Sequence, residues 1–432
     1  MKTGPTQTSV SRTVCAASCK VLFAITPAVI VVALLTAQVV HGQRAEENPV
    51  TIRPFTIDVS QATLEDLQGR LTRTRWPDEV NDAGWTMGAN LGYLKELVAY
   101  WQNDFDWREQ ESRLNAFPQF KAEIDGVSVH FIHVRGKGKN PTPLLLLHGW
   151  PDSFFRFHKI IPMLTDPERC GGPAEDAFDL VIPSLPGYGF SERPAERGFT
   201  AERMADLFAK LMAALGYSRY GAHGGDWGGV VAEQLALGHG DALLGLHLTD
   251  VPFQHMFALE GVELSEAEQA FLEAANGWSM TEGAYAMLQA TKPQTPAYAL
   301  NDSPAGLAAW IVEKFHAWSD CDGVEGCYTK DELLTNVMLY WTTQTVGSSF
   351  RLYAEGATST WGAPTRVEVP TGFAVFPKDL APAPRRYAER FFNVRRFTEM
   401  PRGGHFGALE QPDLLVGDLR AFFGSLEKQA PD

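Results

Sequence analysis

The sequence predicts an α/β protein whose mostly parallel sheet is covered by helices on both faces, with a helical cap inserted late in the chain and a helical extension before the sheet. Two observations carry this prediction. Short apolar runs typical of buried parallel strands alternate with helix-like segments through most of the chain. Between residue 252 and about residue 360 the strand-like runs stop, and only helical patterns occur.

The N-terminal segment differs in kind from the rest. Residues 1–20 carry three basic side chains and no acid, and residues 21–40 are almost wholly apolar, although Pro27 weakens a single clean helix. This order is typical of an export signal or of an uncleaved membrane anchor. We therefore expect residues 1–43 to be a signal peptide or membrane anchor, and the protein to be exported (periplasmic or secreted) or membrane-anchored.

Residues 44–121 form a predicted N-terminal region that precedes the first clear strand. Helix-like patterns cover residues 62–71, 94–103 and 107–114. Tryptophans are widely spaced through this region, as is usual where a segment packs onto a larger body. We expect the region to be helical and to pack on the core.

The predicted core comprises residues 122–251 and 361–432. Its first strand, residues 127–134, alternates with period 2, and the later ones are short apolar runs. The later expected strands are residues 144–147, 178–182, 243–248, 373–376 and 394–397, with a short one ending near residue 222. The expected helices between them are residues 155–164, 201–215, 230–237, 385–392 and 414–426.

The predicted cap is the insertion at residues 252–360. Helical patterns cover residues 264–275, 304–318 and 331–352. A helical block inserted after a core strand is typical of a cap over the carboxyl edge of the sheet, where open α/β sheets bind ligands. We therefore expect the functional site between cap and core.

A glycine-rich string, GAHGGDWGG at residues 221–229, indicates what that site does. It places Asp226 between Gly224 and Gly228, in the pattern of the nucleophile elbow with aspartate in place of serine. Serine attacking a saturated carbon would leave an ether that water cannot cleave. A carboxylate attacking the same carbon leaves an ester, which water can hydrolyse at the enzyme's own carbonyl. Asp226 therefore favours displacement at a saturated carbon, as in epoxide opening or dehalogenation.

Composition narrows the alternatives. The 432-residue chain has a net charge of −15 and no basic run, so nothing favours nucleic acid as a partner. No spacing of cysteine and histidine resembles a zinc site. Cys321 and Cys327 flank a short loop and either form a disulfide or remain two thiols.

Three further motifs join Asp226 in a fixed order. They are HGWP at residues 148–151, PGYGFS at residues 186–191 and RGGHF at residues 402–406. In this order they resemble the epoxide hydrolases of the α/β-hydrolase fold, most closely the microsomal type. Stretches at residues 291–315, 333–343 and 369–380 extend the resemblance over nearly all the chain after about residue 45. It implies hydrolysis of lipophilic epoxides to vicinal diols through an alkyl-aspartyl ester, with no metal or organic cofactor.

The resemblance also implies roles for individual residues. The nucleophile matches Asp226, the base matches His405 in RGGHF, and the acid that orients the base matches Asp379 in the loop after residues 369–376. Asp250, after the strand at 243–248, remains the rival acid, because some related hydrolases place theirs there.

Two cap tyrosines hold the epoxide oxygen in this family, and they match Tyr285 and Tyr353. The backbone amides of Trp150 and Trp227 match the oxyanion site. Neutral phenols suit their role because they donate hydrogen bonds to a developing alkoxide. The tyrosines that we expect only to pack are Tyr188, Tyr298, Tyr328 and Tyr340.

Other functions remain as alternatives. A haloalkane or haloacid dehalogenase uses the same three residues, but Trp150 stands where dehalogenases commonly carry a polar residue. A non-catalytic member that binds hydrophobic ligands would not need the full set, and an esterase is disfavoured by aspartate at the elbow. The expected partner is a small lipophilic epoxide, without nucleic acid. Membrane attachment through the N-terminal segment and a homodimer stay open.

Overall fold

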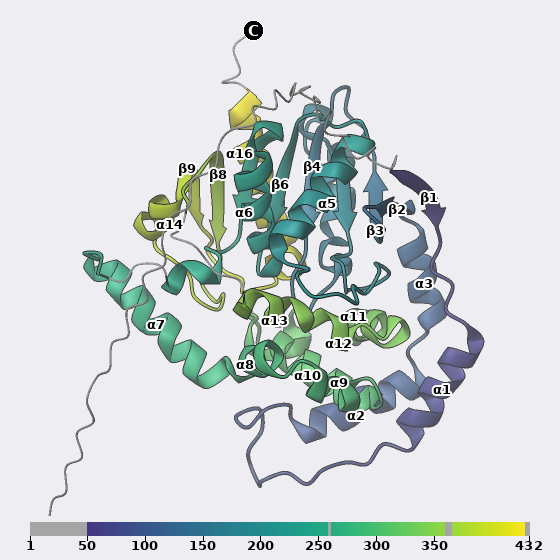
Figure 1. Ribbon diagram of the computed structural model, residues 1–432. Coiled ribbons are helices and arrows are strands. Elements are labelled where there is room, and N and C mark those ends of the chain that lie inside the picture. The colour runs from purple at the N-terminus through teal and green to yellow at the C-terminus, as the bar shows by residue number, and fades with distance from the viewer. Residues whose placement is uncertain (1–49, 258–260, 359–364, 428–432) are drawn as a thin grey trace, which may run out of the picture. The chain divides into compact units, whose positions relative to one another are not determined.

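The computed structural model describes residues 50–257, 261–358 and 365–427 (Figure 1). The predicted leader at residues 1–43 therefore lies outside the described residues. Within the described ranges, no helix is both long and apolar enough to cross a membrane.

A mixed sheet forms the centre of the fold and confirms the α/β prediction. Within the described ranges its nine strands run in the order β1-β2-β3-β5-β4-β6-β7-β8-β9. The neighbours from β5 to β9 pair in parallel, whereas β1, β2, β3 and β5 pair antiparallel. The strands are β1 (Thr51–Phe55), β2 (Gln119–Ile124), β3 (Val127–Val134), β4 (Thr142–Leu147), β5 (Phe178–Pro183), β6 (Tyr220–Gly224), β7 (Leu243–Leu248), β8 (Val367–Val375) and β9 (Phe392–Glu399).

The expectation that residues 44–121 are helical and that the strand at 127–134 comes first is wrong in part, because β1 and β2 precede it and form the antiparallel edge of the sheet. The β1 sequence TIRPF is partly exposed and contains Pro54. Proline is tolerated at a sheet edge, but it also weakens the sequence pattern of a strand. The strand was therefore recognisable only from its pairing partner.

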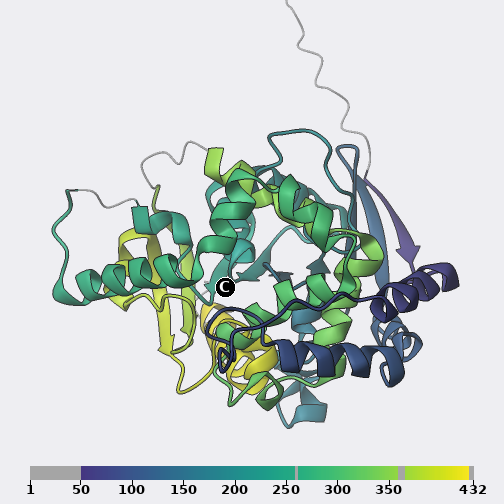
Figure 2. The same ribbon diagram turned by 90° about the horizontal axis from the view of Figure 1, so that it is seen from below.

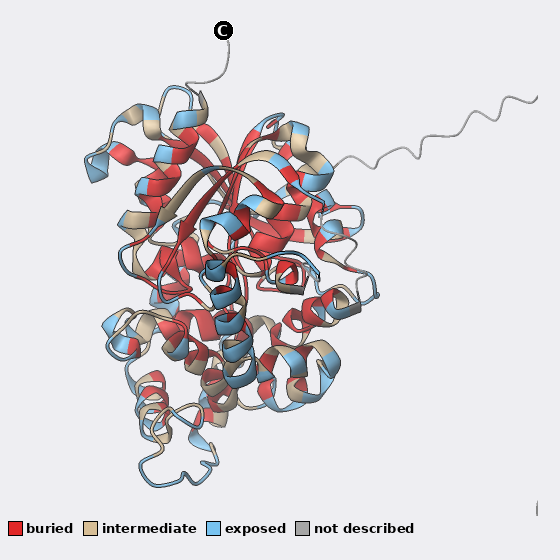
Figure 3. Ribbon diagram, turned by 90° about the vertical axis from the view of Figure 1, so that its left-hand side faces the viewer, coloured by how far each residue is buried: buried red, intermediate tan, exposed pale blue. Residues whose placement is uncertain are grey.

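Helices cover both faces of the sheet, as expected. In Figure 1, α5 (Ala201–Ala214) and α6 (Trp227–His239) lie in front of it, and α16 (Pro412–Glu427) lies behind. The short α4 (Ile160–Thr165) packs beside α16, and α14 (Arg385–Phe391) packs beside β9. Buried residues line the central strands and the helix faces turned toward them (Figure 3).

The cap between β7 and β8 lies along one edge of the sheet, below it in Figure 1 and in front of it in Figure 2. Its helices are α7 (Glu266–Glu282), α8 (Ala284–Thr291), α9 (Gln294–Leu300), α10 (Pro304–Ala317), α11 (Lys330–Thr343), α12 (Val346–Ser349) and α13 (Arg351–Thr358). Helices α8 and α9 were not expected, and the predicted helix 331–352 is broken. The break lies at Gln344, which adopts a left-handed conformation with φ 54° and ends α11.

Apart from β1 and the start of β2, the N-terminal extension is helical, as expected. Its helices are α1 (Gln61–Thr72), α2 (Leu91–Asn103) and α3 (Trp107–Asn115). These helices pack against the cap helices α10 and α11, and Trp85 stacks on His316 of α10 with ring centroids 4.0 Å apart. The extension thus supports the cap as well as the sheet edge. The division into the regions 44–121, 122–251 with 361–432, and 252–360 stays a proposal.

Candidate active site

Asp226 occupies a sharp turn between β6 and α6, with φ 54° and ψ −134°. The glycines on either side are required sterically. A Cβ on Gly224 would lie 2.4 Å from the Gly228 carbonyl oxygen, and a Cβ on Gly228 would lie 2.1 Å from the Leu147 carbonyl oxygen. A non-glycine residue at positive φ is strained and persists only where the surroundings hold it. The turn has the geometry of a nucleophile elbow.

The Asp226 carboxylate faces backbone donors. The Trp150 N–H donates to Asp226 Oδ1 at 2.8 Å. The Trp227 N–H, at the start of α6, lies close enough to the carboxylate to lower its pKa. The carboxylate lies against Gly149, where a Cβ would come within 2.3 Å of Oδ1. Burial raises the Asp226 pKa, and the charge of His405 together with the two backbone donors offsets part of that rise.

His405 lies between two carboxylates. Its Nε2 is 3.8 Å from Asp226 Oδ2, and its Nδ1 is 2.7 Å from Asp379 Oδ1. Burial lowers the imidazole pKa, but the charge and hydrogen bond of Asp379, followed by the charge of Asp226, outweigh it and raise the pKa to about 9. The structure thus brings together the three residues that the sequence predicted from separate motifs.

The rival acid, Asp250, makes different contacts. Its Oδ1 accepts hydrogen bonds from the Asp226 backbone N–H and from the Thr249 hydroxyl, each at 3.1 Å. Asp250 therefore holds the backbone of the turn, whereas Asp379 holds the imidazole. Burial, followed by the charge of Asp379, raises the Asp250 pKa to about 7.

Tyr285 of α8 and Tyr353 of α13 bring the cap to the elbow. Tyr285 stacks on Trp150 with ring centroids 5.0 Å apart, and Tyr353 meets Trp227 edge-on at 5.0 Å. Burial raises both phenol pKa values well above 10. The charge of Asp226 adds to the rise at both. Both phenols are therefore neutral donors at neutral pH.

Several buried polar atoms at this site have no hydrogen-bond partner among the described residues. They are His405 Nε2, Tyr353 Oη, Trp150 Nε1 and Asp379 Oδ2. Buried polar atoms are normally paired, and leaving one open costs about 1–3 kcal/mol. Open donors and acceptors grouped around a carboxylate are what a site needs to bind a polar group of a ligand or an attacking water.

The tyrosines that were expected only to pack use their hydroxyl groups elsewhere or point outward. Tyr188 donates to the Ser349 carbonyl at 3.1 Å, and Tyr340 donates to the Asp152 carbonyl at 2.6 Å. The Tyr328 hydroxyl pairs with the Ser319 hydroxyl at 2.6 Å, and Tyr298 is 75% exposed.

Sequence reasoning missed a buried ion pair beneath the site. The Asp152 carboxylate accepts from the Gly149 N–H at 2.9 Å and is paired with Arg156, which also donates to the His405 carbonyl at 2.6 Å. Although burial raises the Asp152 pKa, the charge of Arg156 together with the hydrogen bond and charge of His148 outweighs it and lowers the pKa to about 2. Arg156 thus ties the HGWP loop to the histidine loop. The available signal was a single arginine inside the aromatic run FFRF.

The open question about the cysteines is answered by a disulfide between Cys321 and Cys327, whose Cα atoms are 5.7 Å apart. In the part of the chain that the structure describes, the cluster of potential metal ligands is formed by these two cysteines and Glu410. The disulfide uses both sulfurs, so this cluster offers no thiolate ligand.

Comparison with known proteins agrees with this geometry. Residues 52–157 match the family described as epoxide hydrolase N terminus, and residues 142–279 match the alpha/beta hydrolase fold. A relative from Stigmatella aurantiaca is 45% identical, over 87% of this chain and 85% of its own. Epoxide hydrolase 1 of Sus scrofa is 39% identical, over 88% of this chain and 90% of its own.

Solved structures give the same answer. The juvenile hormone epoxide hydrolase of the silkworm Bombyx mori superposes with a TM-score of 0.77 at 32% identity, covering 89% of this chain and 96% of its own. Identity at this level over so much of both chains establishes common membership. The chain belongs to the epoxide hydrolases of the α/β-hydrolase fold.

Proposed function

We propose that the protein hydrolyses lipophilic epoxides to vicinal diols in two steps, through a covalent ester on Asp226. One observation carries the proposal: the Asp226 carboxylate, whose side chain is only 11% exposed, faces two backbone donors, the His405 imidazole and two phenols from the cap. Family membership supports the activity, and the geometry supports the roles.

In the first step, Tyr285 and Tyr353 hydrogen-bond the epoxide oxygen, and Asp226 attacks the accessible ring carbon from the opposite side. The C–O bond of the ring breaks as the ester forms, and the alkoxide takes a proton from one of the two phenols. The proton that His405 loses after alkylation then restores that phenol. The open Tyr353 hydroxyl and the raised pKa values of both phenols support this assignment, because a neutral phenol has a hydrogen to donate.

In the second step, His405 takes a proton from a water, which attacks the ester carbonyl and releases the diol. The imidazole, with its pKa of about 9, is protonated in the free enzyme at neutral pH. Ester formation removes the charge of Asp226, one of the contributions that raise this pKa. The pKa of His405 therefore falls after alkylation, and the imidazole becomes the base when a base is needed.

The Trp150 and Trp227 amides stabilise the tetrahedral intermediate of this second step. The Trp150 N–H already donates to the carboxylate oxygen that becomes the oxyanion, and the Trp227 N–H lies close to the same carboxylate. Such a preorganised donor lowers the activation barrier by ~3 kcal/mol. No metal or organic cofactor takes part in this sequence.

The preference for lipophilic substrates follows from the walls of the site. Asp226 is surrounded by the rings of Trp150, Trp227, Tyr285 and Tyr353, and Phe253 meets Trp227 edge-on at 5.2 Å. Rings at these positions bury apolar substituents of the epoxide while the two phenols engage its oxygen.

The leader supports a further part of the proposal, that residues 1–43 export the protein or anchor it to a membrane. N-terminal sequencing of the native protein separates the two outcomes. A start near residue 43 means a cleaved signal, and an intact leader in the membrane fraction means an anchor.

A His405→Gln variant tests the two-step reaction. Without a base, it should form the ester with about one equivalent of a styrene-type epoxide and then stall. Intact-mass measurement should show the enzyme heavier by the mass of one epoxide. Sustained turnover by the variant at the wild-type rate would refute the assignment of the base, and diol formation without any adduct would refute the covalent route.

A further inference from the structure

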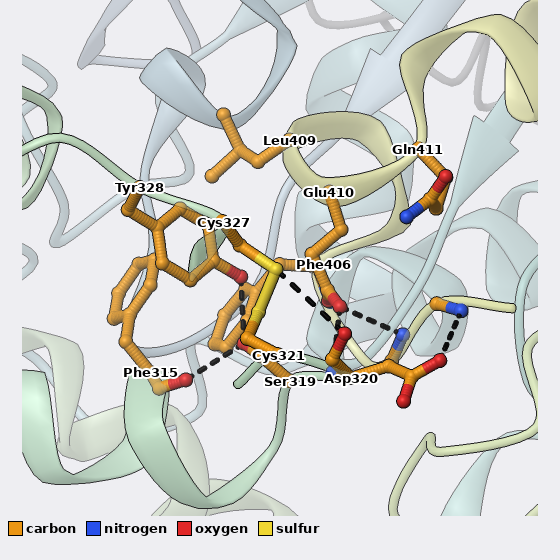
Figure 4. The surroundings of a disulfide bond; sticks show 12 residues. Phe315, Ser319, Asp320, Cys321, Cys327, Tyr328, Phe406, Leu409, Glu410 and Gln411 are labelled. Atoms are coloured by element: carbon orange, nitrogen blue, oxygen red, sulfur yellow. Dashed lines mark hydrogen bonds between the residues drawn. A yellow bond between two sulfur atoms is a disulfide. The ribbon is translucent and has the colours of Figure 1, made fainter. Parts of the chain in front are cut away.

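The backbone around His405 is held by a loop of the cap. The histidine loop, residues 402–406, faces the cystine loop, residues 318–327, which joins α10 to α11 (Figure 4). The His405 N–H donates to the Trp318 carbonyl at 2.8 Å, and the Gly403 N–H donates to the Asp320 carboxylate at 2.9 Å. The two loops are therefore joined by hydrogen bonds directly at the proposed base.

Glu410 connects the same two loops from the other side. Its Oε2 accepts from the Asp320 and Gly404 N–H groups at 2.8 and 2.9 Å, and its Oε1 accepts from the Phe406 N–H at 2.9 Å. One carboxylate thus satisfies donors on both sides of His405 and one donor of the cystine loop. In Figure 4, Glu410 lies beside the disulfide.

The contact between the two loops leaves little room for adjustment. A Cβ on Gly404 would lie 2.4 Å from the Trp318 carbonyl oxygen. Behind it, Phe315 of α10 stacks on Phe406 with ring centroids 4.2 Å apart and planes at 1°. A displacement of the cystine loop would therefore reach the imidazole through the backbone.

The Cys321–Cys327 disulfide begins one residue after Asp320. It joins residues six positions apart and so fixes the part of the cystine loop that follows the contact residues. Without it, this segment would be an open connection between two helices. Both cysteines are partly exposed, so a small reductant can reach the bond.

We propose that the disulfide and Glu410 together clamp the histidine loop and position His405 for hydrolysis of the ester. The inference rests on the two-step reaction proposed above. Ester formation depends on Asp226 and the cap phenols, whereas ester hydrolysis depends on holding His405 within one water of the carbonyl. Opening the disulfide therefore slows the second step more than the first, which it reaches only through the packing of Trp318 on Tyr285, with ring centroids 5.1 Å apart.

The redox step is a thiol–disulfide exchange. A dithiol reductant attacks one sulfur, the S–S bond breaks, and a mixed disulfide forms. The second thiol of the reductant then attacks this mixed disulfide and releases the other cysteine. Two electrons and two protons pass to the protein, leaving Cys321 and Cys327 as thiols and the reductant as a cyclic disulfide.

The experiment measures the two half-reactions separately in the full-length protein. Rapid-quench single turnovers with a styrene-type epoxide are followed by intact mass, which reports the alkylated enzyme. We compare oxidised protein, dithiol-treated protein, a Cys321→Ser/Cys327→Ser double variant and Glu410→Gln. The control is Cys170→Ser, with and without dithiol, because Cys170 is exposed and unpaired in the described part of the chain.

We expect ester hydrolysis to slow about tenfold after reduction and in the double variant, and ester formation to change much less. The double variant should no longer respond to dithiol. Glu410→Gln keeps the disulfide but puts an amide N–H₂ against a backbone N–H, and should slow hydrolysis as well.

Unchanged hydrolysis in the double variant, or equal slowing of both steps, would overturn the inference while leaving the two-step reaction intact. If the oxidised enzyme makes diol without any alkylated intermediate, the proposed reaction itself fails. Should the double variant not fold, Glu410→Gln alone decides. Normal ester hydrolysis in that variant would refute the clamp.

Discussion

Replacing Tyr353 with phenylalanine should have opposite effects on stability and on activity. The Tyr353 hydroxyl is buried and has no hydrogen-bond partner among the described residues. A buried hydroxyl without a partner costs about 1–3 kcal/mol of folding free energy. Its removal should therefore leave the protein as stable as before or more stable, by about 1 kcal/mol.

The same change should slow epoxide opening. A donor aimed at a developing oxyanion contributes ~3 kcal/mol, which corresponds to roughly 10²-fold in rate. Tyr285 remains, so ring opening should continue at the reduced rate. Rapid-quench measurement of the alkylated enzyme gives the rate of the first step, and urea unfolding gives the stability.

Tyr188→Phe is the matched control. Tyr188 is also fully buried near Asp226, but its hydroxyl donates to the Ser349 carbonyl. This variant should lose about 1 kcal/mol of stability and keep its rate of ester formation. If Tyr353→Phe instead loses stability and alkylates at the normal rate, its hydroxyl is a packing element and the reasoning is refuted.

Four further outcomes follow from the same contacts. Asp379→Asn removes the charge that raises the His405 pKa, so ester hydrolysis should slow by roughly 10⁴-fold in single turnovers, and a rate within threefold of wild type would contradict this. The rate of ester hydrolysis in the wild type should rise with pH, with a midpoint below 9, because alkylation removes the Asp226 charge that helps to raise the His405 pKa. A midpoint at or above 9 would contradict the fall of the His405 pKa after alkylation. Reducing the Cys321–Cys327 disulfide should lower the unfolding free energy by about 2 kcal/mol in urea titrations, the loop-closure value for so short a ring, and an unchanged midpoint would mean that the bond adds no constraint. Burial lowers the His130 pKa to about 3, so below about pH 6.5 the unfolded chain binds a proton at this residue and the folded chain does not. The free energy of unfolding should therefore fall by up to about 1.4 kcal/mol for each unit by which the pH drops below 6.5. A His130→Gln variant should show a smaller fall over the same pH range.

The sequence predicted the parts of the site that follow strands. Asp226, Asp379 and His405 each come after a strand of the parallel part of the sheet, and parallel strands bring their carboxyl ends to one edge. Motifs at those points therefore lie together however far apart they are in the chain. Only Asp226 was assigned from its own local pattern, whereas the roles of the other site residues were predicted from the resemblance; these are Asp379, His405, Tyr285 and Tyr353.

The supporting contacts could not be predicted in the same way. The hydrogen bond from Arg156 to the His405 carbonyl joins residues 249 positions apart, and neither residue's neighbours in sequence indicate it. In the sequence, Glu410 is an ordinary acid near the start of a predicted helix. No neighbouring residue indicates that its carboxylate accepts hydrogen bonds from the histidine loop. The break at Gln344 depends on a left-handed conformation that the sequence pattern does not mark. Disulfide formation depended on whether the loop brings Cys321 and Cys327 within reach.

The central claim is that Asp226 is alkylated and then hydrolysed at its own carbonyl. A single turnover in water enriched in heavy oxygen, followed by peptide mass spectrometry and analysis of the diol, tests it most directly. The account predicts that the peptide containing Asp226 gains one heavy oxygen and that the first diol released contains none. Heavy oxygen in the first diol, with an unlabelled Asp226 peptide, would mean that water attacks the epoxide itself and would contradict the account.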